Sequence, residues 1–422
     1  MTTDTQKSKS KIRQFFSVLG PGLISGAADD DPSGIATYSI AGAQFGTSML
    51  WTAWITWPLM AFVQMMCARI GMVTGKGLAG ALREKFPKPV MVLICLTLLI
   101  ANTLNVGADL AGMADAAEIL TGLTSHIYVV LFGVGIAVAV IRFRYHQIAN
   151  TLKWLALTLF AYVITAFLLK PDWVIVGKAT LTPSVPTSAG WGMLVAILGT
   201  TISPYLFFWQ ASQEVEEEKA MGRRMLISRI GATDKEIKNR LLDVGVGTFL
   251  SNLVMFFIIL TTALTLNVHG ITNIQTSKEA AEALKPLAGN LAMLLYTTGI
   301  IGVGLLAIPT LTGSAAYAFS EVFRWKSGLD EKLRQAQAFY GVIILSTVCG
   351  IALDFTGFNP VQALYWSAII NGLLAPFLLI GVLFVARDVK IMRGQPSSLY
   401  SQGVVLLTTL LMFAAAIAMF VF

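Results

Sequence analysis

Three consecutive carboxylates, Asp29, Asp30 and Asp31, interrupt a run of apolar residues and are followed directly by Pro32-Ser33-Gly34. At the centre of a lipid bilayer each aspartate costs about 2.5–3.5 kcal/mol, so the group requires a cation, water or a polar partner. Proline removes a backbone donor and glycine unwinds at little cost, which predicts a break in a helix. An unwound turn offers backbone carbonyls beside carboxylates, and these hard oxygen ligands suit Mg²⁺, Mn²⁺ or Ca²⁺.

A second interruption lies in another apolar run, where Ser203-Pro204 stands within residues 199–205. The proline again predicts a broken helix, and the Ser203 hydroxyl can add an oxygen ligand or hold a water molecule. Neither interruption contains Cys, Met or His, so a soft-metal site has no ligand there. The two segments together favour a hard, partly hydrated cation.

Further polar residues stand within apolar runs and have more than one interpretation. Asp109 is expected to be a proton relay or second carboxylate of the site, or else a hydrogen-bond partner between helices. Asn102 and Asn252 favour interhelical hydrogen bonding over metal ligation. Asn371 is left open between lining a pore and packing. The three aspartates could instead belong to a surface loop, but the apolar run that continues beyond them argues against that interpretation.

The composition requires a membrane environment for these segments. The 422 residues are 55% hydrophobic and only 13% charged, whereas soluble proteins have about 25% charged residues. Many apolar runs reach the length of about 18 residues or more that a spanning helix needs.

The three cysteines, Cys67, Cys95 and Cys349, lie far apart in apolar runs, so we expect small buried hydrophobic residues rather than metal ligands.

Eleven spanning helices are predicted, because a segment within lipid has to satisfy its own backbone hydrogen bonds. Their expected bounds are 16–46 (broken near 29–34), 48–69, 88–114, 125–142, 148–169, 190–214, 240–266, 287–321, 335–356, 360–386 and 399–421.

The first and sixth of these helices carry the two interruptions, which is typical of inverted repeats around a site at the membrane midplane. We therefore expect residues 1–422 to form a single transmembrane domain. Its parts are a tail at 1–15, a five-helix repeat at 16–169, a second repeat at 190–386 and an additional helix at 399–421. The repeats are inferred from the matching breaks and the topology, since no internal sequence identity is visible.

Basic residues predict the orientation. Of the 30 lysines and arginines, all but Lys170, Lys178, Lys278 and Lys285 fall on the side of the N-terminus. This asymmetry predicts a multi-pass protein of the cell (inner) membrane with a cytoplasmic N-terminus and an external C-terminus, and it explains the net charge of +7 without nucleic acid. The longest cytoplasmic segment, 214–240, is expected to be a solvated mixed-charge connector, with a regulatory or lipid-contacting role as the alternative.

Several motifs resemble those of the Nramp family of divalent-metal transporters. The family's first helix, in which the break reads Asp-Pro-Gly-Asn, is similar to three stretches of this sequence: Gly20-Pro21-Gly22, 31–37 and 41–43. Residues 71–79 resemble the segment after its second helix, and Asp109-Leu110-Ala111 resembles its third-helix motif. The resemblance covers nearly the whole chain, is most specific in the first 80 residues, and implies an all-α, LeuT-like fold.

The same resemblance implies roles for individual residues. Asp31 stands at the position of the family's metal-binding aspartate, and Ala28 and Thr200 stand where backbone carbonyls serve as ligands. Gly34 replaces the asparagine ligand, and Ser203-Pro204-Tyr205 replaces Met-Pro-His. The thioether and the histidine linked to proton passage are therefore absent at these positions. Four further residues are expected to line or gate the pathway of the cation, namely Asp30, Tyr205, Asp109 and Asn371.

These departures make the chain most similar to the Nramp-related magnesium transporters. Gly and Ser in place of Asn and Met enlarge the cavity, and Mg²⁺ dehydrates reluctantly and needs room for water. Loss of the histidine removes a side chain that could carry protons near neutral pH. We therefore expect a monomeric transporter, embedded in membrane lipid, that moves Mg²⁺ and Mn²⁺ by alternating access without proton coupling. The divalent cation is its substrate, and no cofactor is expected.

Other functions remain as alternatives. The nearest is a proton-coupled Mn²⁺/Fe²⁺ importer that uses Asp31 and Asp109. A carrier of small organic substrates would place a carboxylate at a half-helix N-terminus, which three aspartates would repel. A cation-sensing receptor usually has a sizeable soluble domain, which the short loops here do not provide. An enzyme is not expected, because the sequence has no phosphate-binding glycine loop, no nucleophile with a histidine partner and no zinc-type cluster.

Overall fold

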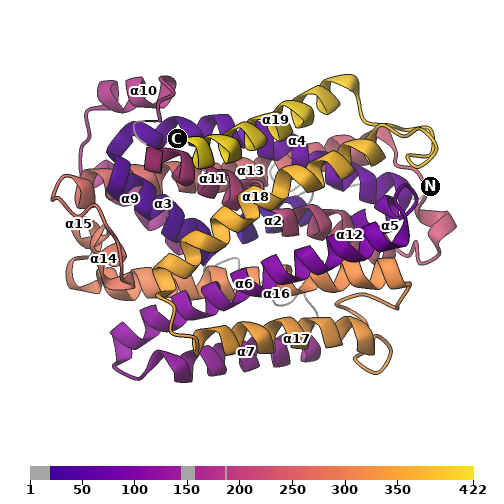
Figure 1. The fold of residues 1–422 in the computed structure, drawn as a ribbon, viewed down its shortest axis with the longest axis horizontal. Coiled ribbons are helices and arrows are strands. Elements are labelled where there is room, and N and C mark those ends of the chain that lie inside the picture. The colour runs from indigo at the N-terminus through magenta and orange to yellow at the C-terminus, as the bar shows by residue number, and fades with distance from the viewer. Residues whose placement is uncertain (1–19, 144–156, 186–187) are drawn as a thin grey trace, which may run out of the picture.

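Helices account for the regular secondary structure that the computed structural model describes, which covers residues 20–143, 157–185 and 188–422 (Figure 1). The long helices are α2 (Pro21–Asp29), α3 (Pro32–Phe45), α4 (Leu50–Thr74), α6 (Lys88–Thr121), α7 (Ser125–Arg142), α9 (Phe160–Leu168), α11 (Ser188–Thr201), α12 (Pro204–Ala220), α13 (Asp234–Thr262), α16 (Ala292–Phe323), α17 (Gln337–Asp354), α18 (Pro360–Ala386) and α19 (Leu399–Val421). The helices that connect these segments are α5 (Leu78–Leu82), α10 (Trp173–Leu181), α14 (Ser277–Glu282) and α15 (Lys285–Ala288), and α10 is as long as the half-helix α2.

Ten of the eleven expected spans are represented by long apolar helical runs within the described residues. Nine helical runs there are long and apolar enough to cross a membrane. One of them, Pro32–Thr74, holds two expected spans, because the turn at Gly46–Met49 separates α3 from α4. The eleventh expected span, 148–169, lies partly outside the described residues, and its remaining part is the apolar stretch Leu157–Leu168.

Both predicted breaks are present, and each has the same local cause. Helix α2 ends at Asp29, and α3 begins at Pro32 with Asp31 as its N-cap residue. Helix α11 ends at Thr201, and α12 begins at Pro204 with Ser203 in the N-cap position. Proline fits the first turn of a helix because the N–H it lacks would have no partner there. Each proline therefore ends one half-helix and starts the next.

The packing relates the two halves of the chain in the expected way. The first half-helix of the first repeat, α2, packs on α13, the second helix of the second repeat. Helix α12, from the first span of the second repeat, packs reciprocally on α4, the second helix of the first repeat. The third helices, α6 and α16, pack on each other, and α7 and α17 lie side by side at one edge (Figure 1). In each repeat, therefore, one half of the broken first helix packs on the second helix of the other repeat.

Helix α2 approaches α13 with almost no side chain between the backbones. A Cβ atom on Gly26 would lie 2.4 Å from the Gly247 carbonyl oxygen, and one on Gly22 would lie 2.6 Å from the Val244 nitrogen. Small residues four apart allow this kind of close helix contact in membrane proteins. The glycines therefore fix the position of α2 beside α13.

Three details differ from the sequence-based expectations. The predicted connector at 214–240 is largely helical, because α12 continues to Ala220 and α13 already begins at Asp234. Helix α10, in the segment after the fifth span, was not predicted. Cys349 was expected to be buried but is exposed on α17, because its helix face points away from the bundle, whereas Cys67 and Cys95 are buried.

Candidate metal site at the two helix breaks

Asp31 is the most heavily hydrogen-bonded carboxylate at the first break. Its Oδ1 atom accepts hydrogen bonds from the Gly34 backbone N–H at 2.8 Å and the Ser33 hydroxyl at 2.6 Å. Its Oδ2 atom accepts a hydrogen bond from the Asn105 amide at 3.1 Å. The side chain is almost completely buried. These contacts orient the carboxylate, as hydrogen-bonding partners do for metal-binding carboxylates in other proteins.

Tyr205 connects the two breaks. Its hydroxyl group donates to the Ala28 carbonyl oxygen at 3.0 Å and lies 3.5 Å from Asp31 Oδ2. Ala28 is in the last turn of α2, where backbone carbonyls lack partners within the helix. The structure therefore brings together Asp31, Ala28 and Tyr205, which the sequence placed in two distant segments.

Ser203 and Thr200 lie together at the second break. The Ser203 hydroxyl lies 2.6 Å from the Thr200 carbonyl oxygen and 2.7 Å from the Gly199 carbonyl oxygen, both of which can accept its hydrogen bond. The Thr200 hydroxyl lies 3.1 Å from the Tyr38 hydroxyl on α3, so α11 also contacts the first broken helix. A cation bound to the Thr200 carbonyl would thus meet the Ser203 oxygen as well.

Gly34 leaves space beside the carboxylate. A Cβ atom added there would meet the Asp29 carbonyl oxygen at 3.4 Å and Asp31 Oδ1 at 3.5 Å, which is ordinary contact distance. A longer side chain at this position would therefore start next to Asp31 and occupy space near it. Glycine leaves unfilled the volume that a Cβ atom would occupy beside Asp31.

Helix α6 contributes a residue that the sequence analysis missed. Asn105, which donates to Asp31, lies on the same helix as Asn102 and Asp109. The spacings of three and four residues put all three on one face of the helix, and this pattern could have identified Asn105. Asn102 donates to the Leu311 carbonyl and the Ser314 hydroxyl of α16, both at 2.8 Å, which confirms its interhelical role.

Asp109 lies close to the site but has no full hydrogen bond among the described residues. It is completely buried, and the Ser33 N–H approaches it without reaching the geometry of a hydrogen bond. Ser33 belongs to the first turn of α3, whose partial positive charge favours a carboxylate. Helix α6 thus places Asp109 near Asp31 and beside the positive end of α3.

The other two aspartates of the break face a different helix. The Ser251 hydroxyl of α13 lies 2.8 Å from Asp29 Oδ2 and 3.1 Å from Asp30 Oδ1. Both carboxylates are buried. Asn371, on α18, is also buried, and no described contact joins it to Asp31. Asn252 accepts from the Thr56 hydroxyl of α4 at 2.7 Å, which confirms the expected interhelical bond.

The ends of the half-helices produce a favourable potential for a cation. The C-terminal ends of α2 and α11 present the carbonyl groups of Ala28 and Thr200, and a helix C-terminus has partial negative charge. Together with Asp31, these groups form a set of hard oxygen donors. Oxygen donors of this kind are the type that a divalent cation retaining part of its water prefers.

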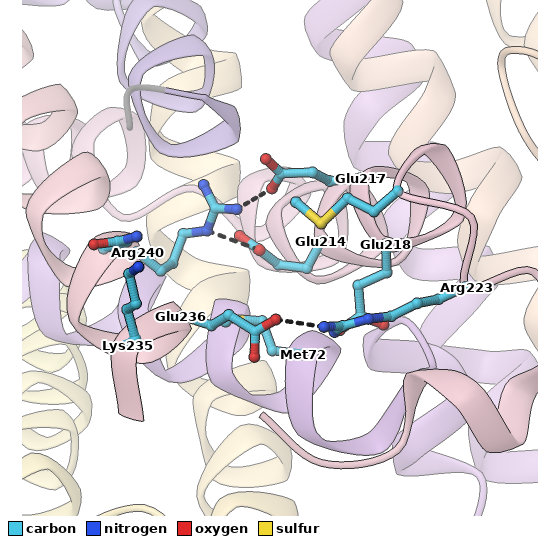
Figure 2. Close-up of a pocket in the computed structure, with 10 residues that line it drawn as sticks. Met72, Glu214, Glu217, Glu218, Arg223, Lys235, Glu236 and Arg240 are labelled. Atoms are coloured by element: carbon cyan, nitrogen blue, oxygen red, sulfur yellow. Dashed lines mark hydrogen bonds and ion pairs between the residues drawn. The ribbon is translucent and has the colours of Figure 1, made fainter. Parts of the chain in front are cut away.

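A charged cavity of about 530 Å³ lies at one end of the α12–α13 pair (Figure 2). Arg240 forms ion pairs there with Glu214, at 2.8 Å, and with Glu217, and Arg223 pairs with Glu236 at 2.6 Å (Figure 2). From this cavity a line of buried polar groups leads towards the breaks. Gln210 donates to Glu214 at 2.7 Å and accepts from Ser25 of α2 at 2.6 Å.

Asp243 attaches the start of α2 to this charged network. Its carboxylate accepts the backbone N–H groups of Gly20, Gly22 and Leu23 at 2.8, 2.8 and 3.0 Å, and it also pairs with Arg240. The first N–H groups of a helix have no partner within it, so a carboxylate here is a strong cap. The position of α2 thus depends on a residue distant in sequence.

Two interrupted helices that meet at a buried carboxylate, in two inverted repeats, define a class of membrane transporter. Within this class, residues 22–422 match the sequence model of the Nramp family, described as natural resistance-associated macrophage protein-like. The chain therefore belongs to the Nramp family, a family of membrane transporters and not of enzymes.

Known relatives agree with this membership. The chain is 28% identical over 318 residues to the divalent metal cation transporter MntH of Yersinia pestis (strain Pestoides F), covering 73% of each chain. It is also 28% identical over 318 residues to MntH of Erwinia tasmaniensis, covering 74% of this chain and 72% of the relative.

Solved structures confirm the fold. A manganese transporter of Eremococcus coleocola, in complex with an aromatic bis-isothiourea substituted compound, is similar with a TM-score of 0.76 at 18% identity, covering 98% of this chain and 88% of that chain. Mhp1, a nucleobase-cation-symport-1 family transporter, is similar with a TM-score of 0.58 at 14% identity, covering 95% and 90%. The expected LeuT-like architecture is thereby confirmed.

Proposed function

We propose that this protein carries Mg²⁺ and Mn²⁺ across the membrane by alternating access and without proton coupling, with Asp31 as the principal ligand. The observation that carries the proposal is the oxygen-only donor set at the two breaks, where Asp31 lies beside Ala28 and Tyr205. The divalent cation is the substrate, and the proposal includes no resident cofactor. The relatives named as divalent metal cation transporters support the general class of substrate.

In this proposal, the small residues Gly34 and Ser203 make the site suitable for Mg²⁺ rather than for softer transition metals. Gly34 leaves space next to Asp31, and Ser203 offers a hydroxyl group where a thioether would favour softer transition metals. Because Mg²⁺ keeps several water molecules when bound, the ion enters such a site only if there is room for them. The carbonyl oxygens of Ala28 and Thr200 complete the proposed protein ligands, with Ser203 within reach.

A second candidate is a proton-coupled Mn²⁺ or Fe²⁺ importer, which one observation favours. Asp109 is buried near Asp31 without a full hydrogen bond among the described residues. A carboxylate in such surroundings can bind a proton when a cation leaves or enters. The two candidates differ in whether protons accompany the metal.

Uptake into proteoliposomes tests the metal site. We expect Asp31→Asn to abolish Mg²⁺ and Mn²⁺ uptake, because a carboxylate is lost from the centre of the donor set. Asp172→Asn is the matched control, since Asp172 is likewise an N-cap residue, at the start of α10, and accepts hydrogen bonds from Val174 and Ile175. Uptake by Asp31→Asn equal to that of the control would refute the site.

A pH-sensitive dye inside the same vesicles tests coupling. Under the leading proposal, Mn²⁺ uptake leaves the internal pH unchanged in both the native protein and Asp109→Asn. Acidification in proportion to Mn²⁺ uptake, lost in Asp109→Asn, would instead establish the proton-coupled candidate.

We further propose that the protein is a monomer in the cell (inner) membrane, with a cytoplasmic N-terminus and an external C-terminus. The asymmetry of lysine and arginine residues supports this orientation. Single cysteines at Ser327 and Thr356, in loops at opposite ends of α17, should react with a membrane-impermeant thiol reagent from the cytoplasm and the outside, respectively. Light scattering of the purified protein measures its oligomeric state.

A further inference from the structure

A cavity of about 670 Å³ lies where the end of α18 meets the start of α19, distant in sequence from both helix breaks. Its lining includes Lys85, Arg387, Asp388, Ser397 and Leu399. The connection between α18 and α19 lies at the same end of the helical bundle as α5 (Figure 1). Nothing in the proposed transport cycle uses these residues.

The start of α19 provides unused hydrogen-bond donors. Ser398 caps this 23-residue helix by accepting a hydrogen bond from the Ser401 N–H at 3.2 Å. Within the described part of the chain, the N–H groups of Leu399 and Tyr400 have no acceptor. Free N–H groups and the partial positive charge of a helix N-terminus together favour an anion.

Ser397 gives an independent indication of a ligand. Its backbone is held on both sides, since its N–H donates to the Ala386 carbonyl at 2.9 Å and its carbonyl accepts from the Gln402 side chain at 2.7 Å. Ser397 lines the cavity and is 4% exposed. Its hydroxyl nevertheless has no hydrogen-bond partner among the described residues. Buried hydroxyl groups are normally paired, so this one requires a partner.

Among the described side chains that line the cavity, one of the two basic groups has no acidic partner and can pair with a bound anion. Lys85 pairs with Asp388 at 2.7 Å, and the other Asp388 oxygen accepts the backbone N–H groups of Lys390 and Ile391. The hydrogen bond from Lys85 holds the pKa of Asp388 below its usual value, so this carboxylate stays ionised and paired. Arg387 is exposed, stacks on the Phe384 ring at 4.5 Å, and has no carboxylate partner in the described residues.

The cavity opens beside a surface that faces lipid. Helix α19 is a strongly apolar spanning segment. Six of its large apolar side chains are between 41% and 73% exposed, namely Leu406, Leu407, Leu410, Leu411, Ile417 and Phe420. Leu399 and Tyr400, at its start, are 85% and 73% exposed. Basic pockets at this boundary are suited to phospholipid headgroups.

We propose that this cavity binds the phosphate group of an anionic membrane phospholipid. The N–H groups at the start of α19 and the Ser397 hydroxyl donate to the phosphate oxygens, and Arg387 neutralises its charge. The acyl chains lie along the exposed apolar face of α19. Such a lipid fixes α19 against α18 independently of the metal site.

Native mass spectrometry of the full-length protein in detergent tests the proposal. Phosphatidylglycerol, phosphatidylcholine and the soluble glycerol 3-phosphate are the three probes. We expect retained phosphatidylglycerol, with at least about tenfold weaker binding in Arg387→Gln and Ser397→Ala, since each substitution removes a hydrogen-bond donor to a charged group. Arg334→Gln is the control, because Arg334 is an exposed arginine that does not line this cavity.

Each remaining outcome contradicts a specific part of the proposal. Phosphatidylcholine has no net charge. If it were retained as well as phosphatidylglycerol, the site would not select for an anionic lipid. Glycerol 3-phosphate binding as tightly as the lipid would identify a site for free phosphate esters instead. Unchanged phosphatidylglycerol binding in Ser397→Ala, which changes only one hydroxyl group and preserves packing, would refute the site even if Arg387→Gln failed to fold.

Discussion

Asp243 offers a quantitative test of how the N-terminal end of α2 is held. Its two oxygens accept three backbone N–H groups at the start of α2 and pair with Arg240. Asp243→Asn keeps the shape of the side chain, but one of the two oxygens becomes an NH₂ group. That group faces donors and cannot accept their hydrogen bonds.

The expected effect follows from the number of bonds lost. Each Asp243 oxygen serves two donors, so the asparagine loses two bonds to a charged acceptor. At about 1.5 kcal/mol or more each, docking of α2 is weakened by on the order of 3 kcal/mol. Because 1.4 kcal/mol corresponds to a factor of ten, the undocked population rises roughly 100-fold.

Cysteine reactivity measures this population. Ser25 is 2% exposed on α2, so Ser25→Cys reports undocking when combined with Cys349→Ser, which removes the exposed native thiol. We expect the labelling rate to rise by about two orders of magnitude in Asp243→Asn, provided that opening is rapid. Asp234→Asn, an exposed change on the same helix, should have no effect. Equal rates in the two variants would refute the capping role of Asp243.

Three further predictions concern selectivity, packing and surface chemistry. Gly34→Asn combined with Ser203→Met should weaken Mg²⁺ binding and strengthen Mn²⁺ binding in isothermal titration, because the space for water shrinks and a thioether is added; an unchanged Mg²⁺ affinity would contradict this reasoning. Gly26→Leu should lower the melting temperature by several degrees, since its Cβ atom would lie 2.4 Å from the Gly247 carbonyl oxygen, whereas Gly245→Leu, which faces open space, should not. A membrane-permeant maleimide should label Cys349 and spare the buried Cys67 and Cys95, and mass spectrometry of the peptides would expose any other pattern.

Much of the fold was predictable because lipid imposes simple rules on sequence. The span 125–142 was predicted with the observed bounds of α7, and the two broken helices were predicted from Pro32 and Pro204. Helix ends outside the lipid were less predictable. Where α12 extends to Ala220, its Glu214 and Glu217 pair with Arg240 of α13, which sequence periodicity does not reveal. The start of α13 at Asp234 instead follows a local capping box between Thr233 and Glu236.

The sequence alone determined which residues could bind a cation, because Asp31 and Ser203 stand beside helix-breaking prolines in apolar runs and local backbone chemistry decides where such helices unwind. Only the tertiary structure decided which groups meet. Tyr205 contacts Ala28, and Asn105 donates to Asp31. The Ser251 hydroxyl contacts Asp29 and Asp30. Each of these contacts joins segments that are far apart in the chain. Hydrogen bonds of this kind depend on how the two repeats pack, and packing depends on the whole set of helix surfaces rather than on any local pattern.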